Sequence, residues 1–191
     1  MLRHLALLSQ PPRRLFRLWW SHYRLLVRNP GAILEFPIQW TVDDLAAVTL
    51  GRRALVGAFS EIFVRRRSPQ TPVPGEFVVG EGAVIGAQAN VRAEGGRIVI
   101  GPFCLLAQGV SLIAANHVIR AGARFQELPV DPTRTGVTLE ENVWVAAGVT
   151  ILPGCTVGAN SVIGAGSVVT RSIPSGEIWA GVPARRLRAI E

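Results

Sequence analysis

The chain contains no lysine, so all twenty of its basic residues are arginine. Arginine and lysine serve protein surfaces about equally well except at bidentate sites, so we attribute this absence to codon bias. No stretch approaches the roughly 20 apolar residues that a membrane-spanning helix needs. The apolar run from Leu5 to Leu8 is too short for a signal peptide and is stopped by Pro11 and Pro12. The sequence therefore predicts a cytoplasmic protein.

Acidic residues are absent from the first 28 positions, which carry six arginines. The formal net charge of +7 is therefore concentrated near the N-terminus, and the remainder of the chain is close to balanced. This distribution argues against a basic reading face for nucleic acid. With 191 residues and 49% hydrophobic content, the chain is long enough for one domain with a full core.

A six-residue repeat runs without a break from Leu139 to Thr170. Its first position is always aliphatic, which suits a side chain buried on a pleated surface. Its fourth position is Asn or Gly, the residues that enter left-handed backbone conformations most cheaply. The first-position residues are Leu139, Val145, Ile151, Val157, Ile163 and Val169. Short strands and tight corners that alternate in this way predict a parallel β-helix.

The same period extends upstream to Leu50 and groups into about five coils of three short faces, which predicts a triangular prism. In first-position numbering the coils are 50/56/62, 79/85/91, 100/106/112, 139/145/151 and 157/163/169. We therefore divide the chain into a helix and connector with one strand (1–49) and a repeat domain (50–191). Two insertion loops, 65–76 and 114–137, are expected to leave the prism at its corners, because a loop inside a face would strip the backbone partners of neighbouring coils.

Cys104 and Cys155, the only two cysteines, both occupy the fifth position of their repeats. Other repeats place Val, Ala or Ser there. The two thiols are therefore interpreted as small core residues and not as a disulfide or a metal pair.

The pattern of polar and apolar side chains over residues 13–28 predicts an amphipathic helix, preceded by Pro11-Pro12 and ended by Asn29-Pro30-Gly31. One face gathers Arg13, Arg14, Arg17, Ser21, Arg24 and Arg28, and apolar residues, several of them aromatic, cover the rest. Two interpretations stay open. The helix packs its aromatic face onto the domain with the arginines in solvent, or it lies on an anionic membrane surface, where cations opposite Trp and Leu are favoured.

His117 is the only histidine of the repeat domain, and it stands at the mouth of the longest insertion. Long loops on a rigid scaffold are where function tends to reside. A lone histidine is more often structural than catalytic, but this placement makes His117 a candidate functional residue.

Several motifs together resemble the hexapeptide-repeat acyltransferases, in particular the maltose, galactoside and polysaccharide sugar O-acetyltransferase branch. They are Ile-Gly-x-x-Ser/Ala-x units, Asn116-His117 before a loop, NVWVAAGVTILPGCTVGANSVIGAGSVVTRSIP from 142, and GVPARRLR from 181. The resemblance is continuous over 112–188, weaker over 50–110 and absent over the first forty residues. It implies an all-β, left-handed parallel β-helix with a short C-terminal segment, a homotrimer, and an acyl-CoA site between neighbouring prisms.

The same resemblance assigns roles to individual residues. His117 would be the general base for the acceptor hydroxyl, and the Ala147 amide would stabilise the oxyanion. The positions that match CoA contacts are Ala147, Ala165, Thr170, Arg171, Arg185 and Arg188. On the acceptor side lie Asn90, Arg92, Glu94 and Asn116. The chain departs from the family at Ala146, where glycine is usual, and at Val118, where proline often follows the histidine.

The resemblance thus implies an acetyl-CoA-dependent O-acetyltransferase acting on a sugar, a polysaccharide or a lipid-linked glycan precursor. No metal is expected, because the zinc enzymes on this scaffold need three histidines and the domain offers one. Two alternatives stay open: a non-catalytic β-helix scaffold, and an acetyltransferase for an amino sugar or a small-molecule antibiotic. If the N-terminal helix is interfacial, the protein is peripheral to a membrane.

Overall fold

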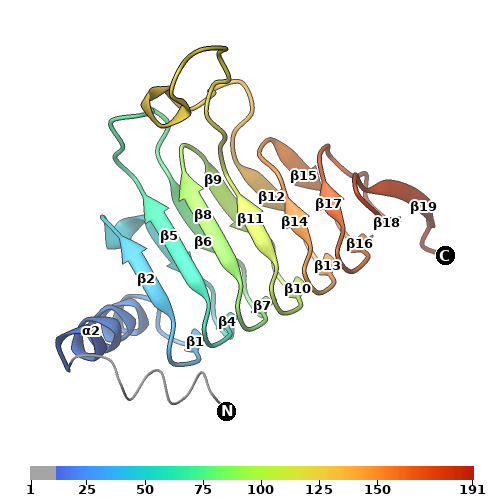
Figure 1. Ribbon diagram of the computed structural model, residues 1–191. Coiled ribbons are helices and arrows are strands. Elements are labelled where there is room, and N and C mark those ends of the chain that lie inside the picture. The colour runs from blue at the N-terminus through green and yellow to red at the C-terminus, as the bar shows by residue number, and fades with distance from the viewer. Residues whose placement is uncertain (1–11) are drawn as a thin grey trace.

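The computed structural model describes residues 12–191, which form a three-walled prism with one helix across its N-terminal end (Figure 1). The helix is α2 (Pro12–Arg28), and two short 3-10 turns follow it, η1 (Leu45–Ala47) and η2 (Phe125–Glu127). Each wall is a sheet in which a strand pairs with the strand one coil further along the chain.

The first wall contains β1 (Ile33–Leu34), β4 (Leu55–Val56), β7 (Val84–Ile85), β10 (Leu105–Leu106), β13 (Trp144–Val145), β16 (Val162–Ile163), β18 (Glu177–Ala180) and β19 (Arg185–Ala189). The second wall contains β2 (Gln39–Val42), β5 (Glu61–Arg65), β8 (Asn90–Glu94), β11 (Ser111–Ile113), β14 (Thr150–Ile151) and β17 (Val168–Val169). The third wall contains β3 (Val48–Leu50), β6 (Glu76–Val79), β9 (Arg97–Ile100), β12 (Val137–Leu139) and β15 (Cys155–Val157). Pairing is parallel throughout these strands except between β18 and β19.

The core is the stack of first-position side chains that the sequence predicts. From Leu50 to Val169 none of these aliphatic residues is more than 5% exposed. The coil grouping is confirmed as well, since Leu50 pairs with Val79 on the third wall and Ile62 with Val91 on the second. The fold is a left-handed parallel β-helix that contains the five predicted coils, with additional winding at both ends.

Fourth-position residues form the corners, and their backbone enters the left-handed region. Asn142 and Asn160 have φ of 56° and 57°, and the Asn142 side-chain amide donates to the Asn160 side-chain oxygen at 2.8 Å. Arg53, Phe59 and Gln88 hold equivalent corners with φ of 57° to 63°. The corner geometry is therefore kept even where the sequence offers neither Asn nor Gly, at a cost of about 1–2 kcal/mol for each such residue.

The prediction of a connector with one strand before residue 50 differs from the structure. Residues 31–50 form an additional coil, in which Leu34 pairs with Val56 and Trp40 with Ile62. The six-residue period therefore reaches Leu34, but Pro37 takes the corner position and η1 inserts extra residues before Leu50. These two departures hide the period from a reading of the sequence.

Helix α2 lies across this first coil and contacts β1 and β2. On α2 itself the side chains of His22 and Leu25 are buried against the prism, whereas those of Trp19, Trp20 and Tyr23 are about half exposed. The interpretation in which the aromatic face packs onto the domain is therefore wrong, because the inward side is a narrower stripe of smaller residues. No helix among residues 12–191 is long and apolar enough to cross a membrane.

Burial of His22 makes the docking of α2 depend on pH. The imidazole is 8% exposed, and desolvation lowers its pKa from the ordinary 6.5, a shift partly offset by a backbone hydrogen bond at Leu34. The folded state therefore holds His22 neutral, while the unfolded chain takes up a proton as pH falls below about 6.5. The stabilising contribution is complete above pH 6.5 and is lost as pH falls toward the lowered pKa. We expect the melting temperature to decrease between pH 7.5 and 5.5 by more in the wild type than in His22→Asn, as measured by thermal unfolding.

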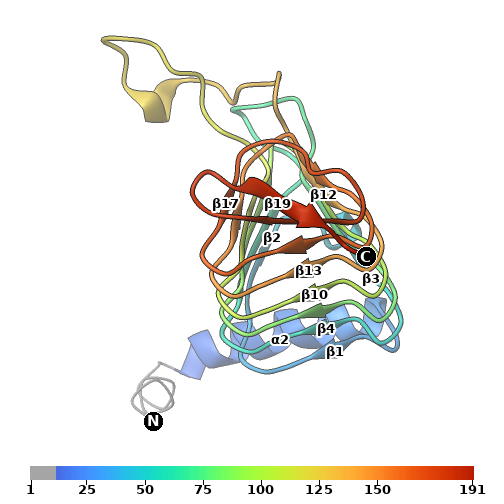
Figure 2. The same ribbon diagram turned by 90° about the vertical axis from the view of Figure 1, so that its right-hand side faces the viewer.

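The C-terminal segment is a hairpin of β18 and β19 that covers the far end of the prism (Figure 2). Glu177 ties its strands together, since it accepts from the Trp179 indole N–H and from Arg186 Nε, both at 2.7 Å. These two hydrogen bonds lower the pKa of Glu177, and the one from the Trp179 indole has the larger effect. Cys104 and Cys155 are buried free thiols, and burial raises the pKa of both.

Both long loops leave the prism at the corner between the second and third walls (Figure 1). One joins β5 to β6 and the other joins β11 to β12. They touch each other, because the Val130 amide donates to the Gln70 carbonyl oxygen at 3.1 Å and Gln70 Nε2 donates to the Gln126 carbonyl oxygen at 3.2 Å. The longer loop therefore rests on the shorter one.

Candidate active site

His117 is held at the base of the longer loop by a short antiparallel pairing. It forms a bridge with Val130. On either side of it the Val118 amide donates to the Pro129 carbonyl oxygen at 2.9 Å, and the Asp131 amide donates to the Asn116 carbonyl oxygen at 2.8 Å. The outgoing and returning halves of the loop therefore fix the backbone of the histidine just beyond the end of β11.

The imidazole is exposed, and its orientation is fixed from one side. Nδ1 lies 2.9 Å from the carbonyl oxygen of Leu128. A carbonyl oxygen only accepts hydrogen bonds, so Nδ1 carries the proton of the neutral ring and Nε2 carries the free lone pair. The side chain thus offers a basic nitrogen to a group that approaches from the solvent side.

The residues beneath this pairing are closely packed. Leu128 and Val130 are buried, and Gly95 lies where the two long loops meet the turn between β8 and β9. Its φ is +69°, and an added Cβ would lie 2.9 Å from Val130 Cγ1, 3.1 Å from Ala115 Cβ and 3.3 Å from Thr71 Cγ2. A side chain at residue 95 would therefore push the base of the histidine loop outward.

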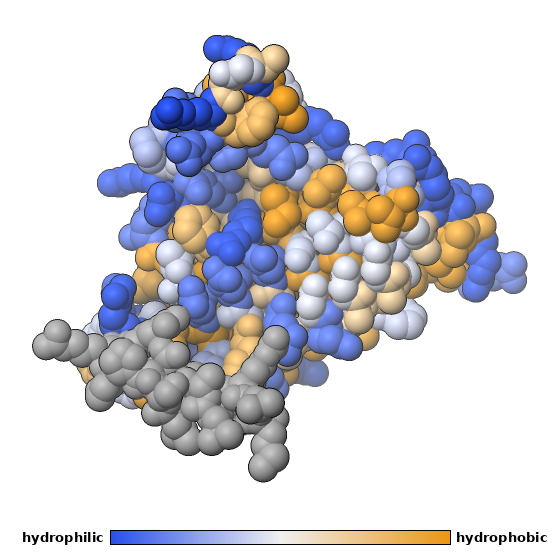
Figure 3. Space-filling model, viewed as in Figure 1, coloured by the Kyte–Doolittle hydropathy of each residue, from blue (hydrophilic) through white to orange (hydrophobic). Residues whose placement is uncertain are grey.

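The candidate acceptor residues occupy the outer surface of the second wall, where Figure 3 shows hydrophilic residues over β5 and β8. Arg92 pairs with Glu61 at 2.9 Å, Glu94 lies 3.8 Å from Arg65, and both guanidinium groups lie over the Phe63 ring. This network fixes the outward side chains of the strand that lies beside β11.

Asn90 begins the same strand, and its side-chain oxygen is buried without a hydrogen-bond partner among the described residues. A buried polar atom in this condition indicates a missing donor. Asn116 is exposed at the start of the loop. The structure thus brings Asn90, Arg92, Glu94 and Asn116 to the wall that leads to His117, although within residues 12–191 no hydrogen bond or ion pair joins any of their side chains to the imidazole.

The candidate CoA residues lie on other parts of the surface. Ala147 and Ala165 stack at the corner between the first and second walls, and the Gly166 amide donates to the Ala147 carbonyl oxygen at 2.9 Å. The Ala147 amide itself has no acceptor within the described part of the chain. This corner is at the opposite edge of the second wall from the histidine loop, so one chain does not bring Ala147 and His117 together.

The remaining CoA candidates are near the C-terminal end. Thr170 and Arg171 follow β17 at the corner that carries the long loops, and the Arg171 guanidinium lies 5.3 Å from the centre of the Trp179 ring. Arg185 and Arg188 project from β19, are exposed, and have no carboxylate partner in residues 12–191. These cations are free to meet an anionic ligand.

Sequence reasoning missed two contributors to this region. The Leu128 carbonyl oxygen sets the tautomer of His117, but a backbone atom leaves no signal in residue identity. Arg134, on the returning half of the loop, donates to the Thr170 carbonyl oxygen at 2.8 Å and thereby joins the loop to the C-terminal coil. Arg134 is far from Thr170 in the sequence, and the sequence does not predict the path of the loop that brings them together. Among the described residues no three His, Cys, Asp or Glu side chains are grouped so that they could hold a metal ion.

Comparison with known proteins assigns this architecture to a family. The family model for bacterial transferase hexapeptide (six repeats) matches residues 136–171. A Schizosaccharomyces pombe protein named for acetyltransferase activity is 33% identical over 160 residues, which are 79% of this chain and 76% of that protein. The chain belongs to the hexapeptide-repeat transferases. The family predicted from the sequence is thereby confirmed.

Other relatives of this hexapeptide-repeat transferase are matched over a shorter range. The galactoside O-acetyltransferase of Escherichia coli is 39% identical over 97 residues, 49% of this chain and 44% of that enzyme. A Saccharomyces cerevisiae protein, also named for acetyltransferase activity, is 41% identical over 100 residues, 52% of this chain and 50% of that protein. The chain thus spans about half the length of these two relatives.

Solved structures share the fold. A point mutant of AntD, an N-acyltransferase from Bacillus cereus, in complex with dTDP-4-amino-4,6-dideoxyglucose and coenzyme A superposes with a TM-score of 0.70 at 19% identity, and the match covers 84% of this chain and 81% of that one. A maltose O-acetyltransferase from Clostridium difficile has a TM-score of 0.51 at 26% identity, with 85% of this chain and 68% of that one covered. The galactoside and maltose enzymes support the sugar O-acetyltransferase branch.

Proposed function

We propose that this hexapeptide-repeat transferase moves an acetyl group from acetyl-CoA to a hydroxyl of a sugar or of a polysaccharide or lipid-linked glycan precursor. The hydrogen bond between His117 Nδ1 and the Leu128 carbonyl oxygen, at 2.9 Å, carries the proposal. In the neutral ring this hydrogen bond leaves the lone pair on Nε2, at the mouth of the loop. The names of the galactoside and maltose relatives support a sugar hydroxyl as the acceptor.

The reaction needs one base and no covalent enzyme intermediate. Nε2 of His117 takes the proton of the acceptor hydroxyl as that oxygen attacks the carbonyl carbon of the thioester. The carbon–sulfur bond of the resulting tetrahedral species then breaks, and the imidazolium returns the proton to the departing thiolate. The Leu128 carbonyl oxygen holds the ring and stabilises its charged form during this cycle, because it accepts from Nδ1–H in both protonation states.

The separation of Ala147 from His117 supports a site built between two copies of the chain in a homotrimer. In that arrangement the loop corner of one prism faces the Ala147 corner of the next. The unpaired Ala147 amide is then free to donate to the oxyanion of the tetrahedral species. Ala165 and Thr170 would line the pantetheine arm, because small side chains let the backbone approach it. Sedimentation equilibrium is expected to give a mass three times that of the 20.6 kDa chain.

The outer surface of the second wall supplies the acceptor side of the proposal. Arg92 and Glu94 are held by their ion pairs with Glu61 and Arg65, so their positions are set before any sugar binds. Asn90 stands at the start of the same strand, two residues before Arg92. Asn116 adjoins the base.

Acetyl-CoA turnover tests the activity. CoA release, followed with a thiol-trapping reagent across a panel of sugars and matched amino sugars, is expected to depend on a hydroxyl acceptor. Release with amino sugars alone would contradict O-acetyl transfer in favour of N-acetyl transfer. If the trimer releases no CoA above background with any acceptor, the protein is a non-catalytic scaffold and the proposed activity is wrong.

Arg188 tests the donor side, with its neighbour as a matched control. Arg188→Gln is expected to raise the KM for acetyl-CoA by roughly 10- to 150-fold with little change in kcat, because a charge-assisted contact to a phosphate is worth about 1.5–3 kcal/mol. Arg186→Gln removes the same charge from the same strand, but Arg186 is already paired with Glu177 at 2.7 Å, so its KM should stay near the wild-type value. Equal effects of the two substitutions would show that net charge, and not a specific contact, sets the KM.

A further inference from the structure

Helix α2 exposes a stripe of apolar side chains that we call the aromatic stripe, consisting of Phe16, Trp19, Trp20, Tyr23 and Val27. Each of these side chains is between 45% and 64% exposed. Their rings contact one another, with centroids 5.6 Å apart for Trp19 and Tyr23 and 6.2 Å apart for Phe16 and Trp20. The stripe lies on the side of the helix opposite His22 and Leu25, and Trp20 at its edge also lines the groove between α2 and β2.

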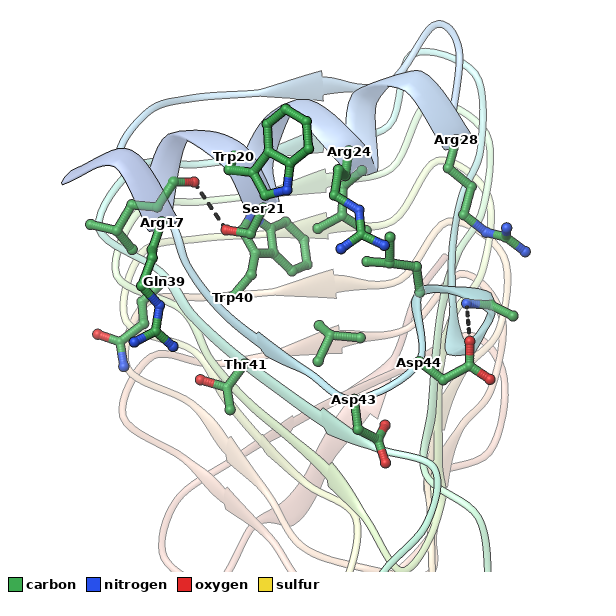
Figure 4. A pocket seen from close by; sticks show the side chains of 15 residues that line it. Arg17, Trp20, Ser21, Arg24, Arg28, Gln39, Trp40, Thr41, Asp43 and Asp44 are labelled. Atoms are coloured by element: carbon green, nitrogen blue, oxygen red, sulfur yellow. Dashed lines mark hydrogen bonds between the residues drawn. The ribbon is translucent and has the colours of Figure 1, made fainter. Parts of the chain in front are cut away.

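A second stripe, consisting of Arg17, Arg24 and Arg28, runs along one flank of the helix between the aromatic stripe and the buried side. This arginine stripe borders a groove of about 980 Å³ between α2 and the strand β2 with its following turn. Figure 4 shows Arg17 and Arg24 reaching from α2 over the groove and Arg28 at its end. The arginines therefore stand beside the aromatic rings and at the edge of an open space.

Within the described residues, the acids on the far wall of the groove form no ion pair with this stripe. Asp43 accepts from the backbone amides of Arg66 and Arg67, and Asp44 pairs with the Arg66 side chain at 3.2 Å. Within the described residues Arg17, Arg24 and Arg28 form no ion pair, and α2 contains no acidic residue. The helix consequently presents unpaired positive charge next to exposed aromatic surface.

We propose that α2 docks the protein on the surface of an anionic lipid bilayer. The aromatic stripe enters the interfacial region, where Trp and Tyr rings are favoured, while the arginine stripe meets the phosphate groups beside it. The binding is peripheral, because α2 is too short and too polar to cross the bilayer. The charge pattern selects this occupant over a second copy of the chain, since stripe-to-stripe packing would bring two unpaired arginine rows together.

The proposal stands apart from the acetyltransferase activity, because α2 caps the end of the prism and the histidine loop leaves its corner between the second and third walls (Figure 1). It gives the proposed enzyme a direct route to acceptors that are attached to lipid. Vesicle binding can therefore be measured whether or not CoA turnover is found.

Co-sedimentation of the full chain with vesicles tests the docking. Binding is expected to phosphatidylcholine vesicles that contain phosphatidylglycerol, to be much weaker without phosphatidylglycerol, and to decrease as salt screens the arginines. The double variant Arg17→Gln/Arg24→Gln should weaken binding about 25-fold, from about fivefold for each arginine near an anionic surface. Trp19→Ala/Trp20→Ala should weaken it at least about tenfold, because two interfacial rings are removed.

Matched controls come from the exposed loop between β11 and β12. Arg120→Gln/Arg124→Gln removes the same charge, and Ile119→Ala/Phe125→Ala removes two exposed apolar side chains. Both should bind vesicles like the wild type, and circular dichroism should show all four variants folded. Absence of binding at low salt would overturn the proposal, as would α2 variants that bind as well as the controls. A lower oligomeric state of Trp19→Ala/Trp20→Ala, without vesicle binding by the wild type, would assign the stripe to contact between copies instead.

Discussion

Replacement of His117 by alanine is expected to lower kcat/KM for the acceptor by about two to four orders of magnitude, the range attributed to a positioned general base. The loss should fall on kcat, because the imidazole is proposed to act on the reacting hydroxyl and to add little to the binding of acetyl-CoA. The Leu128 carbonyl oxygen holds Nδ1 at 2.9 Å, so no other tautomer of the neutral ring keeps this hydrogen bond. Initial rates of CoA release at several acceptor concentrations give both constants.

Two comparisons separate a chemical role from a disturbance of the loop. Arg120→Ala changes an exposed residue of the same loop and is expected to retain wild-type rates. The melting temperature of His117→Ala should match that of the wild type, since the side chain is exposed and contributes one hydrogen bond. If His117→Ala turns over acetyl-CoA at the wild-type rate, the base is a different group and the mechanism proposed above is wrong.

Substitution of Gly101 by alanine is expected to destabilise the prism by about 3 kcal/mol, near the upper end of what overpacking usually costs. Gly101 occupies the second position of its repeat, and an added Cβ there would meet the backbone of the next coil. An added Cβ would lie 2.5 Å from the Glu140 carbonyl oxygen and 2.6 Å from the Glu140 carbonyl carbon. Neither atom belongs to a flexible side chain, so a backbone has to move. Thermal unfolding should show a melting temperature lower by about 6–12 °C, at about 2–4 °C for each kcal/mol in a chain of this size.

Gly166 provides the matched substitution, because it needs glycine for a different reason. Its φ is +67°, and no atom lies within 4 Å of an added Cβ. Gly166→Ala should therefore cost only the backbone strain, about 1 kcal/mol. A larger loss for Gly166→Ala than for Gly101→Ala would mean that corner conformation, and not the spacing between coils, limits the stability of the wall.

The repeat domain could be predicted from the sequence because every sixth residue is an aliphatic residue of the buried core. Leu139, Val145 and Ile151 mark three successive walls, and each is buried as its position requires. The coil before Leu50 was missed because Pro37 replaces the usual corner residue and η1 interrupts the count. The sequence also left open which side of α2 faces the prism, since apolar residues cover most of that helix and the periodicity of a wide apolar face does not select one stripe.

The candidate site was predictable only in part, for a related reason. His117 is visible in the sequence as a solitary imidazole beside a long insertion, but its partner is the carbonyl oxygen of Leu128, an atom that every residue possesses. The position of Gly95 beneath Val130 depends likewise on the return path of the loop. The distance of Ala147 from the histidine within one chain follows from the three-walled geometry, which spreads consecutive repeats around the prism.

The caps at the two ends of the prism control how this chain can polymerise. A β-helix with bare terminal strands offers open backbone donors and acceptors to the next molecule and can extend into a filament. Here α2 packs against β1 and β2 at one end, while the antiparallel β19 and the bridge between Val157 and Ile173 close strands at the other. A second copy therefore finds β1 and β2 covered by α2 and no parallel strand beyond β18 to extend, which disfavours head-to-tail growth relative to lateral association of the walls.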